Sequence, residues 1–364
     1  MKLLTKSTKN PIFVDFLNQW VEEELMTSSR SSNTLTTYRV IVKHIQAESI
    51  SRMRLRSITT SHLQNFMDEI CLKKSYARST CNCYLSVLNC VFRFAIYPKQ
   101  IILSNPMEFV INKKKNYNIS ISQNDHLFYN TITPQQFQAI TNYLREHRSS
   151  SLLPIQIGYY TGLRLGEVCG LTWEDIDLEN EYLIVRRTIF YNTNRHCMEM
   201  GTTKSGKPRI VDFGHVLCSI LKREKASQEK LDRDSSSNLF DNYFRKVSEN
   251  HRDYYELYCF QKGEVVPDYM HQINFVCRQG NGSFLKPRTV QNMCISVRRS
   301  LPGIDHFHFH SLRHTYTSNL LNKGATPQDV QEILGHSDVR TTMNIYAHSQ
   351  RESRRRVVQM LDEV

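Results

Sequence analysis

The sequence predicts a mainly α-helical protein with a small β-sheet, divided into two domains. The chain of 364 residues is long enough for two domains of ordinary size, and its 40% hydrophobic residues can supply a core in each. Apolar residues recur at helical spacings in most stretches and alternate in only two short ones. We expect a helical domain over 1–110, a basic linker over 111–130, and a mixed α/β domain over 131–364 that ends in a tail at 350–364.

The chain is strongly basic, and the excess is concentrated near its start. It has 47 Lys and Arg against 35 Asp and Glu, a formal net charge of +12. Residues 1–125 hold 17 of the basic and 9 of the acidic residues, so they carry a net +8. Such a field attracts polyanions and makes nucleic acid the first partner to consider. A solvated surface without any such partner explains the charge equally well.

Several classes of protein are disfavoured by the sequence. No apolar run approaches the ~18–20 residues that cross a bilayer, and residues 1–6 are too polar for the core of a signal peptide. The ten cysteines are scattered, apart from Cys81 and Cys83, and form no paired metal-ligand motif. We therefore expect an unexported protein with reduced thiols and no membrane contact.

Helical periodicity accounts for the first domain. One amphipathic helix is expected over 11–24, a second after the capping residues 32–34, a third from Thr60 and a fourth over about 79–96. The pattern breaks between 104 and 131, where the run Lys113-Lys114-Lys115 lies, and this stretch is the expected linker.

The second domain opens with a capping box. Thr133 precedes Pro134 and is followed three residues later by Gln136, so a helix is expected to about residue 148. Residues 181–191 and 207–213 are predicted strands around a polar connection. Residues 222–272 are interpreted as a helical insertion plus loop, and helices dominate from there on.

Two candidate functional pieces lie before the predicted insertion. Gly162 permits a tight entry into a helix, Arg164 lies near the start of that helix, and Glu167 on the same face can orient the guanidinium. An ordinary surface Arg–Glu pair is the competing explanation. Lys204 lies between the predicted strands, where a side chain at a hairpin tip can reach into a cleft or remain solvated.

The other pieces lie near the C-terminus. His310 and Arg313 share a face at the start of a helix; alternating His306, His308 and His310 also suggest zinc, which we disfavour because no Cys or carboxylate completes the ligand set. A further helix is expected to begin at the cap Thr326 and end at Gly335 in the left-handed conformation. His336 follows it, and Tyr346 lies ten residues later; each alone is more typical of a helix-end contact or of packing.

Taken together and in order, these pieces resemble the active site of the tyrosine recombinases, the integrases of phages and conjugative elements. The matching residues are Arg164, Lys204, His310, Arg313, His336 and Tyr346. The likeness extends over 131–364 and, more loosely, over the helical first third, which is similar to the SAM-like core-binding domain of that family. The fold expected from it is therefore a helical core-binding domain plus a mixed α/β catalytic domain.

The resemblance implies a site-specific recombinase that works without metal, ATP or another cofactor. Two guanidiniums, Arg164 and Arg313, suit the charge that develops on phosphorus during strand cleavage, and His310 and His336 can add hydrogen bonds or move a proton. Tyr346 is the candidate nucleophile that forms the 3′-phosphotyrosyl link. The resemblance assigns proton donation to Lys204 and a supporting role to Glu167. Lys113, Lys114 and Lys115 are expected to lie near the DNA backbone.

The partners implied by the resemblance are double-stranded DNA and further copies of the chain in a synaptic tetramer. An excision or directionality factor and a DNA-bending protein are optional partners, and the location is a bacterial cytoplasm, at the nucleoid during reaction. Three alternatives stay open: a type IB topoisomerase, a catalytically silent DNA-binding regulator of the same fold, and a metal-dependent nuclease. Intact candidate residues disfavour the second, and the lack of a carboxylate cluster disfavours the third.

Overall fold

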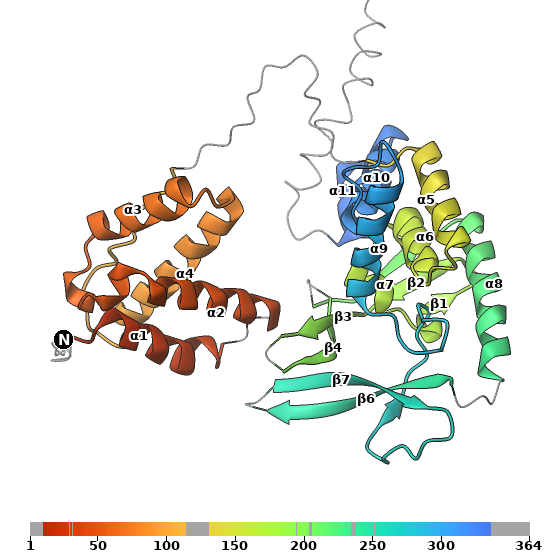
Figure 1. Cartoon of the computed structure of the whole chain (residues 1–364), viewed down its shortest axis with the longest axis horizontal. Helices are drawn as coiled ribbons and strands as arrows, with labels where there is room; N and C mark the ends of the chain where they lie inside the picture. The colour runs from red at the N-terminus through yellow and green to blue at the C-terminus, as the bar shows by residue number, and fades with distance from the viewer. Residues whose placement is uncertain are drawn as a thin grey trace, which may run out of the picture. The chain divides into compact units, whose positions relative to one another are not determined.

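The structure of the protein is a computed structural model that describes residues 10–28, 30, 32–113, 131–193, 195–203, 206–233, 238–249 and 252–335. The chain divides into two compact units, Met1–Gln123 and Asn124–Val364, each of which is described by itself (Figure 1). The expected fold class, mainly α with small β-sheets, is confirmed. The boundaries drawn at residues 110 and 131 stay a prediction. No helix among the described residues is both long and apolar enough to cross a membrane.

The regular structure of the first unit's described part is helical, as its periodicity predicts, apart from one β-bridge between Ile12 and Arg54. Phe13 and Phe92 stack in its core with ring centroids 5.4 Å apart, and Trp20 and Tyr84 are buried beside them. The third helix is capped by Thr59, whose side chain accepts the N–H of His62. Its elements are α1 (Phe13–Trp20) with a π-helical extension (Val21–Leu25), α2 (Ser32–Ala47), α3 (Thr60–Asp68) with a π-helical extension (Glu69–Lys73), and α4 (Arg78–Ile96).

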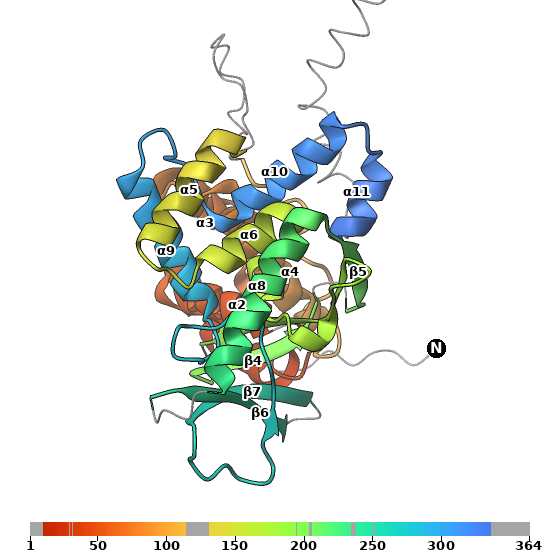
Figure 2. The same cartoon turned by 90° about the vertical axis from the view of Figure 1, so that its right-hand side faces the viewer.

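The second unit has its helices at one end and its larger sheet at the other, as both views show (Figures 1 and 2). The helix α6 packs against α10, and Gly158 allows this approach because a Cβ there would lie 2.6 Å from Cζ of Phe309. The helices are α5 (Pro134–Glu146), α6 (Leu152–Thr161), α7 (Leu165–Cys169), α8 (His215–Asp232), α9 (Pro287–Ser300), α10 (Phe309–Asn322) and α11 (Pro327–Leu334). The capping box predicted at Thr133 and the cap predicted at Thr326 are both present, and Thr326 forms a capping box with Asp329 as well.

Two antiparallel sheets accompany these helices. The smaller has the order β1-β2-β5 and the larger the order β3-β4-β7-β6-β8. The strands are β1 (Ile176–Asp177), β2 (Tyr182–Val185), β3 (Arg187–Asn192), β4 (Cys197–Thr202), β5 (Arg209–Asp212), β6 (Phe240–Glu249), β7 (Arg252–Gln261) and β8 (His271–Gln272).

Strands lie in both stretches where the sequence predicts them, 181–191 and 207–213, but the number of strands and their pairing differ from the prediction. The stretch predicted over 181–191 is two strands, β2 and β3, which belong to different sheets, and the connection contains a further strand, β4. The strand β4 was not recognised in the sequence because one of its buried positions holds a polar residue, Glu199. The carboxylate of Glu199 accepts a hydrogen bond from Asn192 and pairs with Arg195.

The interpretation of residues 222–272 as a helical insertion plus loop was also wrong. Among the residues of this stretch that the structure describes, only the C-terminal part of α8 is helical, and β6 and β7 form a ten-residue antiparallel pair that runs from Phe240 opposite Gln261 to Glu249 opposite Arg252. Cross-strand ion pairs, such as Arg245 with Glu256, stabilise the pair in place of a regular apolar alternation.

Candidate active site

Arg164 is placed by a tight turn between two helices. The helix α6 ends at Gly162 in the left-handed conformation, with φ 65° and ψ 14°, and this turn is the tight entry that the sequence predicts before Arg164. Arg164 then caps α7 and is held by Glu167 at two points. Its backbone N–H donates to Oε2 at 3.0 Å, and its Nη1 donates to Oε1 at 2.9 Å. The predicted orienting role of Glu167 thus matches the geometry.

Glu167 is shared between two arginines. Its carboxylate is buried, at 2% exposure, and also accepts Nη2 of Arg209 at 2.7 Å and Nη1 of Arg209 at 3.2 Å. Burial opposes ionisation of this carboxyl group, but the hydrogen bonds and charge of Arg209, and then those of Arg164, outweigh it and lower its pKa. Glu167 is therefore ionised at neutral pH and keeps both guanidiniums in fixed orientations.

Arg313 lies in the interior beside this pair. It projects from α10 and is 2% exposed. Its Nη1 donates to the carbonyl oxygen of Gly162 and its Nη2 to that of Leu334, both at 2.8 Å. Burial and the positive charges of Arg164 and Arg209 lower the pKa of Arg313 to about 9, although Glu167 acts in the opposite direction. Arg313 remains a cation at pH 7.

The C-terminal end of α11 brings the arginines together. Three successive carbonyls there each accept a guanidinium: Ile333 from Nε of Arg209 at 3.1 Å, Leu334 from Arg313, and Gly335 from Nη2 of Arg164 at 3.4 Å. The last carbonyls of a helix lack intrahelical partners and carry the negative end of its dipole, so they suit cations. The site is therefore a positive cluster built on a helix end.

His310 lies at the start of α10 near this cluster. Its ring meets that of His314 edge-on, with centroids 4.7 Å apart. Although the residue is exposed overall, the protein atoms around its ring partly withdraw it from water, and this lowers its pKa to about 4, helped by the charges of His314 and Arg313. The imidazole is therefore neutral at pH 7 and acts as a hydrogen-bonding group rather than as a further charge.

The alternating histidines do not share one ligand face. The helix α10 begins at Phe309, and His308 caps it by accepting the N–H of Ser311 at Nδ1. Within the residues that the structure describes, no three His, Cys, Asp or Glu side chains converge as metal ligands would.

Several predicted site residues lie outside the described residues. These are Lys204, His336, Tyr346, Lys114 and Lys115. The described chain ends at Gly335, directly before His336. On either side of Lys204, the nearest described residues are Thr203 and Gly206. The structure therefore brings together Arg164, Glu167, His310 and Arg313 and places the chain ends that lead to His336 and Lys204.

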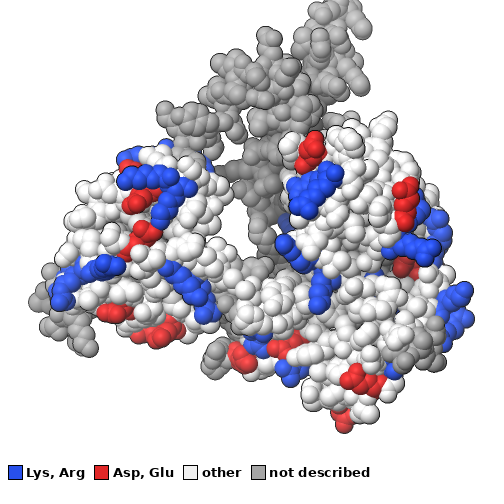
Figure 3. Space-filling view, viewed as in Figure 1, with Lys and Arg blue, Asp and Glu red and all other residues white. Residues whose placement is uncertain are grey.

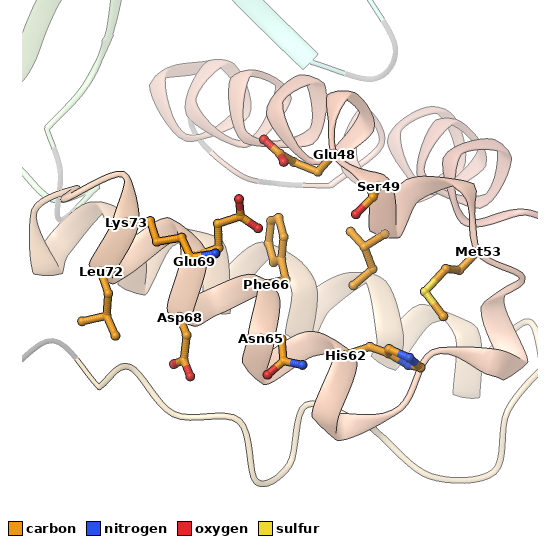
Figure 4. A pocket seen from close by; sticks show the side chains of 11 residues that line it. Glu48, Ser49, Met53, His62, Asn65, Phe66, Asp68, Glu69, Leu72 and Lys73 are labelled. Carbon is orange, nitrogen blue, oxygen red and sulfur yellow. The ribbon is translucent and has the colours of Figure 1, made fainter.

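Charge on the first unit is mixed. On the face drawn in Figure 3, Lys and Arg are interspersed with Asp and Glu over both units. Lys113, a predicted DNA contact, pairs with Asp68 at 2.6 Å. A cavity of about 650 Å³ beside α3 is lined by carboxylates that include Glu48, Asp68 and Glu69 (Figure 4). Lys73 also lines this cavity, and Glu48 and Asp68 are paired with Lys74 and Lys113, so the lining does not mark the cavity as a site for the DNA backbone.

Gly335 gives a test of the helix end. It adopts φ 62° and ψ 47°, and a Cβ there would lie 3.2 Å from Cδ of Arg209. We expect Gly335→Ala to lower the free energy of unfolding by about 1–2 kcal/mol, because L-residues are strained in this conformation, and to slow DNA cleavage by displacing Arg209. Urea unfolding and cleavage assays measure the two effects.

A matched control for this substitution is Gly303→Ala. Gly303 also has a positive φ, 77°, but open space surrounds the position of its Cβ. Gly303→Ala should lower the free energy of unfolding through backbone strain alone and leave the rate of cleavage unchanged. Equal cleavage rates for the two variants would contradict a role of the helix end in the site.

Comparisons with known families agree with this geometry. A family model described as "Phage integrase family" matches residues 130–353, and one described as "Phage integrase, N-terminal SAM-like domain" matches residues 17–99. The chain belongs to the phage integrase family. As a member of it, this chain is a site-specific tyrosine recombinase, an enzyme that cuts and rejoins DNA, and the resemblance inferred from its motifs is confirmed.

Similar proteins include integrases of phages and transposons. The integrase of Staphylococcus phage L54a is 23% identical over 100% of this chain and 97% of its own length. The transposase from transposon Tn916 of Enterococcus faecalis is 24% identical over 87% of this chain and 70% of its own. The Tn1549 transposon integrase, solved in complex with a circular intermediate DNA, shares the fold with a TM-score of 0.69 and 19% identity, covering 97% of this chain and 100% of that one.

Arg209 is the site residue that sequence reasoning missed in this integrase-family chain. Its segment drew attention only because of Lys204, five residues earlier. No local signal marks Arg209, since its partners Glu167 and Ile333 lie 42 and 124 residues away in the sequence.

Proposed function

We propose that this integrase-family chain cuts and rejoins DNA through a 3′-phosphotyrosyl intermediate on Tyr346, and that it integrates or excises a mobile element. The observation that carries the proposal is the convergence of Arg164 and Arg313 on the end of α11, from which the chain leads to His336 and Tyr346. Two fixed cations at this place are what a scissile phosphate needs.

The arginines are assigned to the phosphate. Strand cleavage without a metal concentrates negative charge on the oxygens of a pentacoordinate phosphorus, and forked guanidiniums stabilise it with several directed hydrogen bonds. Arg164 keeps 28% of its side chain exposed and so is accessible to DNA. Arg313 is buried, and its positive charge stabilises the negative charge on the phosphate oxygens. Charges in a buried environment interact more strongly than in water.

The reaction balances with this chain's own residues. The phenolate oxygen of Tyr346 attacks phosphorus, the bond from phosphorus to the 5′-oxygen breaks, and Lys204 donates a proton to that oxygen. The positive cluster lowers the cost of ionising a phenol with a reference pKa of about 10. His310 and His336 bond to the phosphate oxygens or relay a proton. The new ester conserves the energy of the old one, so a second 5′-hydroxyl can reverse the step without ATP.

The partners in this proposal are duplex DNA and further copies of the chain. A lambda integrase tetramer bound to a Holliday junction shares the fold with a TM-score of 0.58 and 16% identity, covering 95% of this chain and 80% of that one. That likeness supports the proposal of a synaptic tetramer on DNA. An excision factor and a DNA-bending protein are proposed as accessory partners, and the bacterial cytoplasm as the place of action.

The experiment uses a duplex built from the DNA that flanks the gene, with a nick just past the cleavage point. The short 5′-hydroxyl fragment then diffuses away and rejoining is prevented. We expect wild type to accumulate a covalent protein–DNA adduct in EDTA, and the linked peptide to contain Tyr346. Loss of the adduct with chelator, or a link at another residue, would overturn the proposal. Relaxation of supercoiled plasmid lacking these sequences would favour a topoisomerase.

A further inference from the structure

Arg209 is fully committed to other parts of the protein. It is the first residue of β5, and its side chain is 11% exposed. Each of its three nitrogens donates to a protein oxygen: Nη1 and Nη2 to the two carboxylate oxygens of Glu167, and Nε to the carbonyl of Ile333. Its guanidinium therefore bridges two elements, α7 and α11, rather than facing a vacant site.

We propose that Arg209 is a positioning residue for strand transfer, which orients Arg164 through Glu167 and holds the end of α11 against the two other arginines. This inference rests on the proposed function of the site. Without Arg209, the buried carboxylate of Glu167 would keep Arg164 as its one hydrogen-bonded cation. The side chain of Arg164 is 28% exposed, against 11% for that of Arg209. Arg209 fixes the carboxylate from the protein side, so that Arg164 is free to meet substrate with a set orientation.

The helix end is shaped for this contact. Gly335 leaves room for the guanidinium plane, since a Cβ would lie 3.2 Å, 3.3 Å and 3.4 Å from Cδ, Nε and Cζ of Arg209. A lysine has one nitrogen and cannot reach Glu167 and Ile333 with separate donors at once. The fork geometry of arginine is therefore what the two elements require.

Arg209 also lies shortly after Lys204 in the sequence, where the described chain has resumed. The strand β4 ends at Thr202 and β5 begins at Arg209, which pairs with Val185 of β2. Thr203 closes the turn by donating from Oγ1 to the carbonyl of Lys207 at 2.9 Å. Arg209 thus follows the proposed proton donor by five residues in the sequence, and it contacts both the carboxylate that orients Arg164 and the helix end before His336.

The test measures single-turnover cleavage of the nicked duplex by wild type and Arg209→Lys. We expect Arg209→Lys to bind DNA within about twofold of wild type but to cleave it about 10- to 100-fold more slowly, the effect of misplacing a reacting group by about 1 Å. The control is Arg278→Lys. Arg278 is as buried, at 7% exposure, and has the same forked contact with a carboxylate, that of Asp232, but it contacts no residue of the site. Arg278→Lys should cleave at the wild-type rate.

A pH profile separates positioning from a general loss of structure. The charged groups that face Glu167 are Arg164, Arg209 and Arg313. Arg209→Met removes the strongest of these influences, so burial should raise the pKa of Glu167 and the cleavage rate should fall on the acidic side at a higher pH than in wild type. Arg209→Lys retains a positive charge and should keep the acidic limb of the profile closer to that of wild type.

A double substitution supplies the remaining control. If Arg209 acts through Glu167, then Arg209→Lys should slow Glu167→Gln much less than it slows wild type. Wild-type cleavage rates in Arg209→Lys, or full additivity with Glu167→Gln, would overturn the positioning role while the proposed function stands. Absence of the covalent adduct in wild type itself would overturn both.

Discussion

Tyr346→Phe should bind the nicked duplex as tightly as wild type and form no covalent adduct. The substitution removes one oxygen, the atom that bonds to phosphorus in the proposed mechanism, and leaves the ring in place. Because no other group can form the same ester, we expect adduct formation to fall below detection, which for a gel assay means a loss of at least about 10³-fold. Binding is measured by mobility shift, and the adduct by denaturing electrophoresis.

Tyr316→Phe is the matched control for this experiment. Tyr316 belongs to α10 and contacts the place of a Cβ on Gly162, so it lies next to the arginine cluster. Burial raises the pKa of its phenol, which disfavours the phenolate that attack requires. Tyr316→Phe should therefore keep the adduct. If the adduct persisted in Tyr346→Phe and disappeared in Tyr316→Phe, the nucleophile would be Tyr316 rather than Tyr346.

Arg164→Lys should lower the rate of cleavage by about 10²- to 10³-fold, the usual effect of removing one charge-stabilising donor from a transition state. A lysine preserves the charge but offers no fork that can contact Glu167 and a phosphate oxygen together. Since Arg209 still binds the Glu167 carboxylate and a lysine retains the positive charge, the melting temperature should change little. Single-turnover kinetics and thermal unfolding measure the two quantities.

Arg313→Lys is the contrasting variant. Arg313 is almost completely buried and satisfies the carbonyls of Gly162 and Leu334. A lysine leaves one of these buried acceptors without its donor, so we expect the free energy of unfolding to fall by about 1–3 kcal/mol in addition to the loss of cleavage. If Arg313→Lys were as stable as Arg164→Lys, the buried hydrogen bonds would not have the structural role assigned to them.

Local signals in the sequence were enough for most of the helices and for the contact between Arg164 and Glu167. The caps at Thr133 and Thr326 and the left-handed end at Gly335 depend on residues within one helical turn, and all three are present as predicted. The pairing of Arg164 with Glu167 is also local, because three residues along a helix separate them.

Features that depend on distant partners were not visible in the sequence. The strands β6 and β7 are polar on much of their length, and pairs such as Lys246 with Asp253 become recognisable only once the register is known. Arg209 is similar, because its partners come from α7 and α11 and no periodicity connects the three segments. Tertiary contacts, rather than propensity, decide such elements.

The three oxygens that hold the arginines at the end of α11 belong to the main chain. Any amino acid at positions 333 and 334 supplies the same acceptor, so alanine there would report only on side-chain packing, whereas Gly335 is also constrained by its left-handed conformation. Replacement of one peptide bond by an ester, which weakens the carbonyl as an acceptor without changing the side chain, is the substitution that exposes this dependence. Drift in sequence at Ile333 and Leu334 is thus compatible with unchanged catalysis, whereas the insertion of a single residue at this helix end is not.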